Sequence, residues 1–276
     1  MARVLSVWGP SGSSGRSTIA ANLACELALE GKRVLLIDLD TYAPSQALMF
    51  GLVDHPPGLA AACRLVAQGR FDVDQVNRLA SSFEAGRGQL SVFTGLSSPE
   101  RWPEVTAEKV AGILEACSEL FDFIVLDLAA ELEPGIRQVG GVLDRNVVTR
   151  TAIGQSDLCL VVVSADAIGV HRYLATHLTV KSLQPNLVIL INRLRSSALG
   201  GNAKQEIGDT LARFAESSVD WFIPNDADSC DQALLEGVPL AMMKRSSPAR
   251  QAIAQFVRVK ILDGHEKPVK RLAKLF

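Results

Sequence analysis

The sequence predicts an α/β fold, an open and mostly parallel β-sheet with helices on both of its faces. Short apolar runs, long enough for strands, recur along the chain and alternate with amphipathic helical segments. A Gly-rich turn joins the first run to the first helix, and carboxylate or amide side chains follow several later runs. Repeated βαβ units make such strands parallel, so these polar residues are expected along one sheet edge, where ligands bind.

The composition is that of a globular protein. The 276 residues, 48% of them hydrophobic, suffice for one large domain, and the formal net charge of -2 gives no sign of bulk affinity for nucleic acid. We expect no secretory signal, because the N-terminus lacks a long apolar stretch. We expect no membrane-spanning helix, because no apolar run approaches ~18 residues. The five cysteines show no C-x-x-C spacing and are expected to be reduced, which favours a cytoplasmic protein.

The turn after the first strand predicts a phosphate-binding loop. The apolar strand is Val4–Trp8, the turn is Gly9–Gly15, and an amphipathic helix follows from Ser17 to Glu30. The free backbone N–H groups of such a turn and the positive end of the helix attract anions. Gly and Ser also form ordinary tight turns, which is the alternative interpretation.

The loop departs from the common pattern G-x-x-x-x-G-K-[ST] at two positions. Pro10 replaces the first Gly, and Arg16 replaces the Lys. Ser17 keeps the hydroxyl group that would reach Mg²⁺.

Carboxylates follow two of the predicted strands. Val34–Ile37 is followed by Asp38 and Asp40, and the apolar run that begins at Phe121 ends on Asp127. Beside a phosphate loop, carboxylates at strand ends hold Mg²⁺ or orient an attacking water. The alternative is that these are ordinary solvated aspartates.

The remaining elements are predicted from the same patterns. Strands are expected at Leu90–Thr94, Leu158–Val163, Leu187–Ile191 and Val219–Ile223. Helices are expected within Pro44–Leu52, twice within Pro56–Gln89, from Thr106 to Leu120, at Ala167–Leu183 and from Pro248 onward. Glu131–Arg150 is expected to be a long loop with a short helix. His171 and His177 lack a second ligand at metal spacing and predict no metal site.

In this order the motifs resemble the MinD/ParA group of P-loop ATPases, the deviant Walker A class. Ser11–Thr18 aligns with its loop, K-G-G-x-G-K-[ST]-[ST], and IAANLACELALEGKRVLLIDLD with its first helix and D-x-D strand. FDFIVLDLAA resembles the Walker B strand without the usual following Pro residues. VILINRLR and WFIPNDADSCDQALLEGVPLA resemble the base-recognition strand and the I-P-x-D segment. The resemblance covers residues 1 to 262, which we expect to form one nucleotide-binding domain.

The resemblance implies ATP and Mg²⁺ as cofactors, a homodimer that forms with nucleotide, and a role in positioning cell-division, chromosome or pilus machinery through an unidentified partner. The roles that it implies by position are phosphate contact for Gly12, Ser13, Ser14, Gly15, Arg16, Ser17 and Thr18; magnesium binding for Ser17, Asp38 and Asp127; catalysis for Asp38, Asp40 and Arg16; and adenine binding for Asn192, Arg193, Pro224 and Asp226.

Two departures from the family's loop lower the expected rate of hydrolysis. Ser11 stands where the family has the Lys that reaches across the dimer, and Arg16 stands where it has the Lys that holds the β- and γ-phosphates. A guanidinium fork does not replace a compact ammonium group conservatively. We expect nucleotide binding with slow or absent hydrolysis. Such loops are also similar to the CpaE/TadZ branch and to actinobacterial MinD-like septum-site proteins.

Two other functions stay open. The chain could be a scaffold, a pseudo-ATPase whose degenerate loop is purely structural. An NAD-dependent oxidoreductase is less favoured: Asp38 follows the Gly-rich turn at about the dinucleotide-binding distance. The G-x-x-G-x-x-G spacing and the D-x-D pair argue against that interpretation.

Residues 263–276 are expected to form a basic tail. Val269, Leu272, Ala273 and Phe276 would form one apolar stripe on a helix, with basic residues beside it. At an anionic membrane the segment Val269–Phe276 would lie in the interface, so we expect peripheral association with the inner face of the cell membrane. A frayed or packed terminus is the alternative. The sequence leaves DNA binding open.

Overall fold

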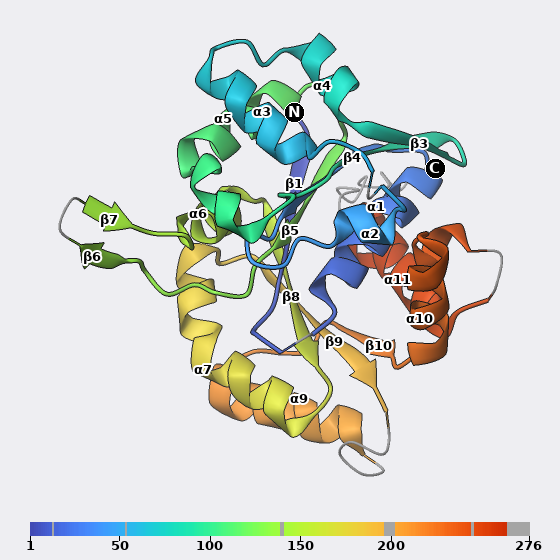
Figure 1. Ribbon diagram of the computed structural model, residues 1–276. Helices are drawn as coiled ribbons and strands as arrows, with labels where there is room; N and C mark the ends of the chain where they lie inside the picture. Colours follow the sequence, from blue (N-terminus) through green and yellow to red (C-terminus); the bar gives the residue numbers. More distant parts are fainter. Residues whose placement is uncertain (13, 53, 139–140, 196–201, 244–245, 264–276) are drawn as a thin grey trace, which may run out of the picture.

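The structure is a computed structural model that describes residues 1–12, 14–52, 54–138, 141–195, 202–243 and 246–263. Eight strands form one sheet in the order β10-β9-β8-β1-β5-β2-β4-β3, and every pair is parallel except β3 with β4 (Figure 1). The predicted fold class is therefore confirmed. The sheet strands are β1 Arg3–Trp8, β2 Arg33–Leu39, β3 Ser81–Ala85, β4 Gly88–Phe93, β5 Phe123–Leu128, β8 Leu158–Ser164, β9 Leu187–Leu194 and β10 Trp221–Pro224.

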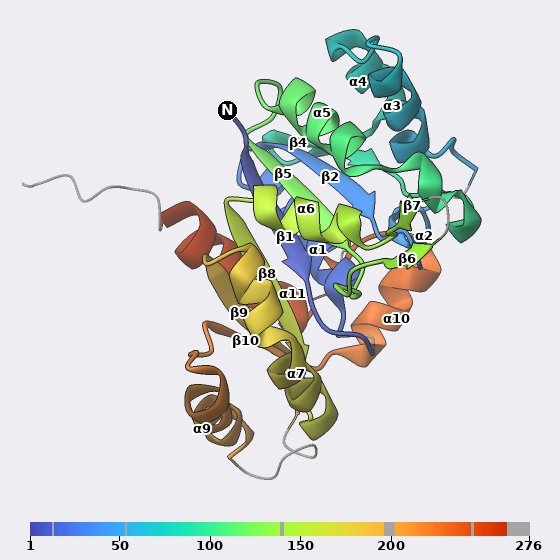
Figure 2. The ribbon, with the colours of Figure 1, turned by 90° about the vertical axis from the view of Figure 1, so that its left-hand side faces the viewer.

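Helices cover both faces of this sheet (Figure 2). They are α1 Arg16–Leu29, α2 Gln46–Met49, α3 Gly58–Ala67, α4 Val73–Leu79, α5 Ala107–Cys117, α6 Val147–Gln155, α7 Ala167–Leu183, α9 Ala203–Ala215, α10 Ala227–Glu236 and α11 Pro248–Phe256. Turns of 3₁₀ helix lie at Pro99–Glu104 and Leu240–Met242, and a π-helical segment follows α11 at Val257–Leu262.

The sheet separates two hydrophobic cores. In β2, Leu35 and Ile37 pack into the core under α3, α5, α6 and α7, whereas Val34 and Leu36 pack into the core around α1 and α11. This period-2 alternation, apolar on both faces, is what a continuous apolar run in a parallel sheet produces. Both faces of the central strands are therefore covered. The carboxyl ends of the strands are the part of the sheet where a ligand could bind.

The sequence prediction was wrong in three places. The Pro56–Gln89 region contains α3 and α4 but also the strand β3, which pairs antiparallel with β4 across a turn where Gly86 has φ +60°. Glu131–Arg150, expected to be a long loop with a short helix, contains the start of α6 and also the antiparallel hairpin β6 Ile136–Gln138 and β7 Gly141–Leu143. Helices α9 and α10, which precede and follow β10, were not predicted at all.

None of the described helices combines the length and the apolar character needed to cross a membrane. The expected amphipathic segment Val269–Phe276 lies outside the described residues, so the tail and its boundary with the domain stay predictions.

Candidate nucleotide-binding site

The sheet topology brings the predicted strand-end residues to one edge. Asp38 of β2 and Asp127 of β5 are paired in the strand register, and Asn192 of β9 is paired with Ser164 of β8. The loop from Gly9 to Gly15 leaves the end of β1, between β5 and β8, and enters α1. Ser13 lies outside the described residues.

Gly15 allows the loop to take its shape. Gly15, directly before α1, has φ +89°, and a Cβ there would lie 2.4 Å from Nδ2 of Asn192. That nitrogen donates to the carbonyl of Ser14 over 2.8 Å. Gly15 is therefore required twice, for the left-handed backbone and for the approach of the amide that fixes the loop.

Arg16 folds back against the start of the loop, and its side chain is only 15% exposed. Its Nε donates to the carbonyl of Leu128 (3.1 Å), and its Nη1 donates to the carbonyls of Gly9 and Pro10 (3.2 Å each). Nη2 lies 3.7 Å from Oδ2 of Asp40. The guanidinium spends three of its five donors on backbone carbonyls, which leaves the two on Nη2 for an anion.

Asp38 holds the turn after β2. Its Oδ1 accepts from the backbone N–H of Asp40 (3.2 Å), and its Oδ2 accepts from those of Ser45 and Gln46 (2.9 Å each). Burial and then the charge of Asp127 raise the pKa of Asp38. Backbone donors contact both oxygens of Asp38, so this carboxylate anchors the turn after β2.

Asp40 presents one oxygen to the loop. Its Oδ1 accepts from the backbone N–H groups of Tyr42 and Ala43 over 2.9 Å each, while its Oδ2 faces Arg16. The carboxylate is thus fixed in direction, with Oδ2 turned toward the phosphate loop.

Asp127 is fully buried, and one of its two carboxylate oxygens accepts a hydrogen bond from Gln46. Its Oδ2 accepts from Nε2 of Gln46 over 2.7 Å, and the same Nε2 donates to the carbonyl of Ser17 (3.1 Å). Burial raises the pKa of Asp127 to about 6, although hydrogen bonds from Gln46 and Ser17 act in the opposite direction. Its Oδ1 has no hydrogen-bond partner within the described part of the chain.

The unpartnered polar atoms converge on this edge. Among the described residues, the buried side-chain atoms without a hydrogen bond are Oγ of Ser14, Oγ of Ser45, Oε1 of Gln46 and Oδ1 of Asp127. Buried polar atoms are normally paired, so the unpaired atoms at this edge are available to contact a ligand, an ion or water. The loop and the residues beneath it therefore present a preformed polar site.

The donor set fits a hard cation that is shared with a phosphate. No group of three or more His, Cys, Asp or Glu that could hold a metal occurs among the described residues. Mg²⁺ needs fewer, because it is bound by one or two protein oxygens together with phosphate oxygens and water. The hydroxyl of Ser17 and the unpartnered Oδ1 of Asp127 are oxygens of that kind.

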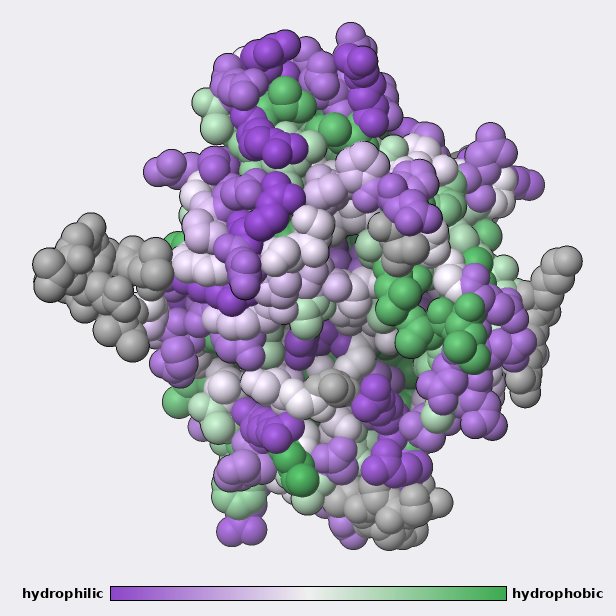
Figure 3. Space-filling view, viewed as in Figure 1, coloured by the Kyte–Doolittle hydropathy of each residue, from purple (hydrophilic) through white to green (hydrophobic). Residues whose placement is uncertain are grey.

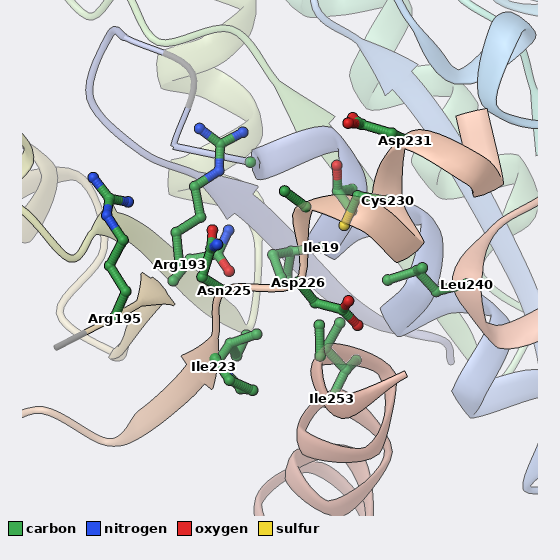
Figure 4. A pocket seen from close by; sticks show the side chains of 16 residues that line it. Ile19, Arg193, Arg195, Ile223, Asn225, Asp226, Cys230, Asp231, Leu240 and Ile253 are labelled. Carbon is green, nitrogen blue, oxygen red and sulfur yellow. The ribbon is translucent and has the colours of Figure 1, made fainter. Parts of the chain in front are cut away.

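A cavity of about 340 Å³ opens on the α1 side of the loop (Figure 4). Its apolar wall is formed by Ile19, Ile223, Leu240 and Ile253, and its lining also includes the predicted Asn192, Arg193, Pro224 and Asp226 together with Gly15 and Thr18. A flat heteroaromatic ring suits such a space, since apolar side chains contact its faces and a few polar groups fix its edge.

The predicted adenine residues play different parts around this cavity. Asn192 spends its Nδ2 on the loop, and Arg193, at φ +58°, holds an exposed side chain at the rim. Although burial acts to raise it, hydrogen bonds from Ser247 and Ser229 keep the pKa of Asp226 below its ordinary value. A fixed charged carboxylate therefore lines the cavity.

The CobQ/CobB/MinD/ParA nucleotide binding domain matches residues 5–239, which is most of the chain. The chain belongs to this family. It is similar to an uncharacterized ATP-binding protein of Methanocaldococcus jannaschii (27% identity, 100% of this chain and 94% of the relative). It is also similar to the septum site-determining protein MinD of Bacillus subtilis (20% identity, 100% of this chain and 98% of the relative).

Solved structures of the family share the fold. The septum site-determining protein MinD of Pyrococcus horikoshii, complexed with Mg-ADP, aligns with a TM-score of 0.74 at 19% identity, over 98% of this chain and 100% of that one. A ParA family ATPase from Chlorobium tepidum aligns with a TM-score of 0.76 at 18% identity, over 94% and 100%. The predicted resemblance to MinD/ParA proteins is confirmed.

Three features of the candidate site were missed by the sequence analysis. Gln46 is fully buried and links Ser17 to Asp127, yet it belongs to no motif. Arg195 lines the rim of the cavity beside Arg193 (Figure 4). The apolar wall draws on Leu240 and Ile253, whose contribution depends on chain-distant packing that no local pattern predicts.

Proposed function

We propose that this protein is an ATP- and Mg²⁺-binding switch of the MinD/ParA type that positions cell-division, chromosome-partition or pilus machinery, with slow or absent hydrolysis. The observation that carries the proposal is the convergence of unpartnered buried oxygens, including those of Gln46 and Asp127, beneath the loop. Relatives named septum site-determining proteins, and one of them complexed with Mg-ADP, support the positioning role and the cofactors.

Each site residue has a distinct part in the proposal. The backbone N–H groups of Gly12–Thr18 and the free donors of Arg16 would bind the phosphates. Ser17 and Asp127 would hold Mg²⁺, which neutralises phosphate charge when bound. Asp38 anchors the turn that carries Gln46 and Asp40, so its part is indirect.

We infer slow hydrolysis from the residues at the two positions where the family has lysine, Ser11 and Arg16. Nε and Nη1 of Arg16 donate to backbone carbonyls, so the guanidinium has little freedom to move toward the negative charge that develops on the phosphate in the transition state. Ser11 supplies no cation to a partner subunit. Asp40 keeps one oxygen, Oδ2, to orient a water molecule. Cationic contacts of the missing kind are worth ~10³-fold or more in rate.

The proposal includes a nucleotide-linked homodimer in the cytoplasm that associates peripherally with the inner face of the membrane through Val269–Phe276. Two weak tails on one dimer would bind an anionic surface far better than one. A division or pilus protein would be the partner. DNA binding is not part of the proposal, given the net charge of -2.

Isothermal titration with Mg-ATP tests the central claim, and we expect binding that is lost when Mg²⁺ is chelated. Absence of binding at millimolar nucleotide would leave the scaffold as the function. Sedimentation and turnover with and without anionic liposomes test dimerisation and membrane association.

The double variant Ser11→Lys/Arg16→Lys tests whether the loop limits turnover. We expect ATP hydrolysis to rise in the double variant relative to the native protein, because both family cations are restored. An unchanged rate would place the block elsewhere in the site.

A further inference from the structure

Helix α7 places an arginine over the tip of the phosphate loop. Nη1 of Arg172 donates to the carbonyl of Ser11 over 3.0 Å. Gly12, the next residue, has φ +102°, and a Cβ built on it would lie 1.7 Å from the same Nη1. The guanidinium of Arg172 thus lies directly against the tip of the loop at Ser11 and Gly12.

The start of α7 is held firmly, so the position of this arginine is set by the fold. Asp166 caps the helix by accepting from the backbone N–H of Gly169 over 2.8 Å. A Cβ on Gly169 would meet the carbonyl oxygen of Ser164 at 2.5 Å, so the first turn packs directly on the end of β8. Tyr173, next to Arg172, is 1% exposed. Figures 1 and 2 both show this end of α7 beside the β1–α1 loop.

The arginine lines a second cavity, of about 330 Å³. It lies on the other side of the loop from the cavity of about 340 Å³ described above, here called the base cavity. The base cavity is lined by Gly15 and Thr18, at the α1 end of the loop, whereas this one is lined by Pro10 and Ser11. A nucleotide whose base lies at the α1 end would direct its terminal phosphate toward the Pro10 end.

The charge of Arg172 is open to an anion. Within the described residues its one hydrogen bond goes to the carbonyl of Ser11, and it forms no ion pair there. Glu131, Glu133 and His171 line the same cavity without pairing with it. Four of its five donors therefore stay free.

We propose that Arg172 binds the terminal phosphate of a nucleoside triphosphate from within the same chain, beside the uncharged Ser11, without replacing the lysine that reaches across the dimer in the family. This inference rests on the proposed function. Ser11 leaves the loop tip without a side-chain charge, and Arg16 serves the start of the loop from below. The consequence is selectivity: a diphosphate lacks the group that Arg172 contacts, so the arginine distinguishes the two nucleotides.

The test compares affinities for two nucleotides in the full-length protein with Mg²⁺ present. The probes are ADP and an ATP analogue with a non-cleavable β–γ bond. Arg172→Ala is expected to weaken the triphosphate analogue about tenfold, the low end for a charge-assisted hydrogen bond at an exposed side chain, and to leave ADP within about twofold. Arg172→Lys is expected to keep part of the preference.

Lys181→Ala is the matched control, because it removes one positive charge from an exposed position on the same helix. It is expected to change neither affinity. Equal losses of both nucleotides in Arg172→Ala, or no loss of either, would overturn the inference while the proposed function stands. If Arg172→Ala does not fold, Arg172→Lys decides, since an unchanged ratio of the two affinities in that variant also overturns the inference. A wild-type protein that binds neither nucleotide would overturn the proposed function itself.

Discussion

Replacing Asp127 by Asn should stabilise the nucleotide-free protein at neutral pH. The carboxyl group is fully buried, and burial raises its pKa to about 6 from the ordinary 3.8. A difference of about two pKa units corresponds to about 3 kcal/mol of the free energy of unfolding. Asparagine keeps an oxygen for the Gln46 donor, and its amide nitrogen can donate to the unpartnered Oε1 of Gln46.

The sign of the effect fixes its pH dependence. Between the unfolded and folded pKa values, the folded protein keeps a proton on Asp127 that the unfolded chain has lost. The contribution of this residue to stability is therefore lost as pH rises through that window, and above about pH 6 the full penalty applies. The stability of Asp127→Asn relative to wild type should grow by about 2 kcal/mol from about pH 4.5 to 7.5.

Urea unfolding at a series of pH values measures this difference. Asp122→Asn is the matched control of opposite sign: although burial acts to raise it, hydrogen bonds from Arg33 hold the pKa of Asp122 below its ordinary value. That variant should lose stability at neutral pH. Mg²⁺ with nucleotide should stabilise the wild type and not Asp127→Asn. A stability difference that stays constant with pH would refute the reasoning about Asp127.

Three further outcomes are expected. Gln46→Leu removes the donor shared by Ser17 and Asp127 and should lower the free energy of unfolding by about 1–3 kcal/mol, measured by urea titration; an unchanged midpoint would contradict the bridge. Gly15→Ala should destabilise by about 1–2 kcal/mol because of its φ of +89°, whereas Gly208→Ala, with open space around it, should stabilise by up to about 1 kcal/mol; thermal melting separates the two. Cys230 is half-buried in the lining of the 340 Å³ cavity, and burial raises its pKa. It should react slowly with a maleimide, and more slowly still when nucleotide is bound. A labelling rate that does not change with nucleotide would exclude the base from this cavity.

Local pattern was enough for the central strands and for most helices. Continuous apolar runs such as Val34–Ile37 and Leu158–Val163 have no alternative in a chain of this size, because they must be buried on both faces. The strand β3 was missed because Ser81–Ala85 has no continuous apolar run. This segment lies at the sheet edge and forms a strand only by pairing with β4. Its Gly86 turn was interpreted as part of a loop.

Some residues of the candidate site could likewise be predicted from local pattern, and others could not. Asp38 and Asp127 were predictable because parallel strands bring their carboxyl ends together, and the register pairs the two residues directly. Gln46 and Arg172 were not, since each acts through contacts with residues far away in the chain. The three backbone N–H groups that donate to Asp38 also needed coordinates, because the sequence gives the position of a carboxylate but not its partners.

The far end of α1 sets where this domain can be shortened. Glu26, although 2% exposed, pairs with Arg250 of α11, and Glu30 pairs with Arg258. Arg3 at the start of β1 donates to the carbonyl of Ile261. A truncation upstream of Val257 would strip apolar cover from the helix that begins at the nucleotide loop, whereas fusions at Met1, which is 98% exposed, leave that packing intact.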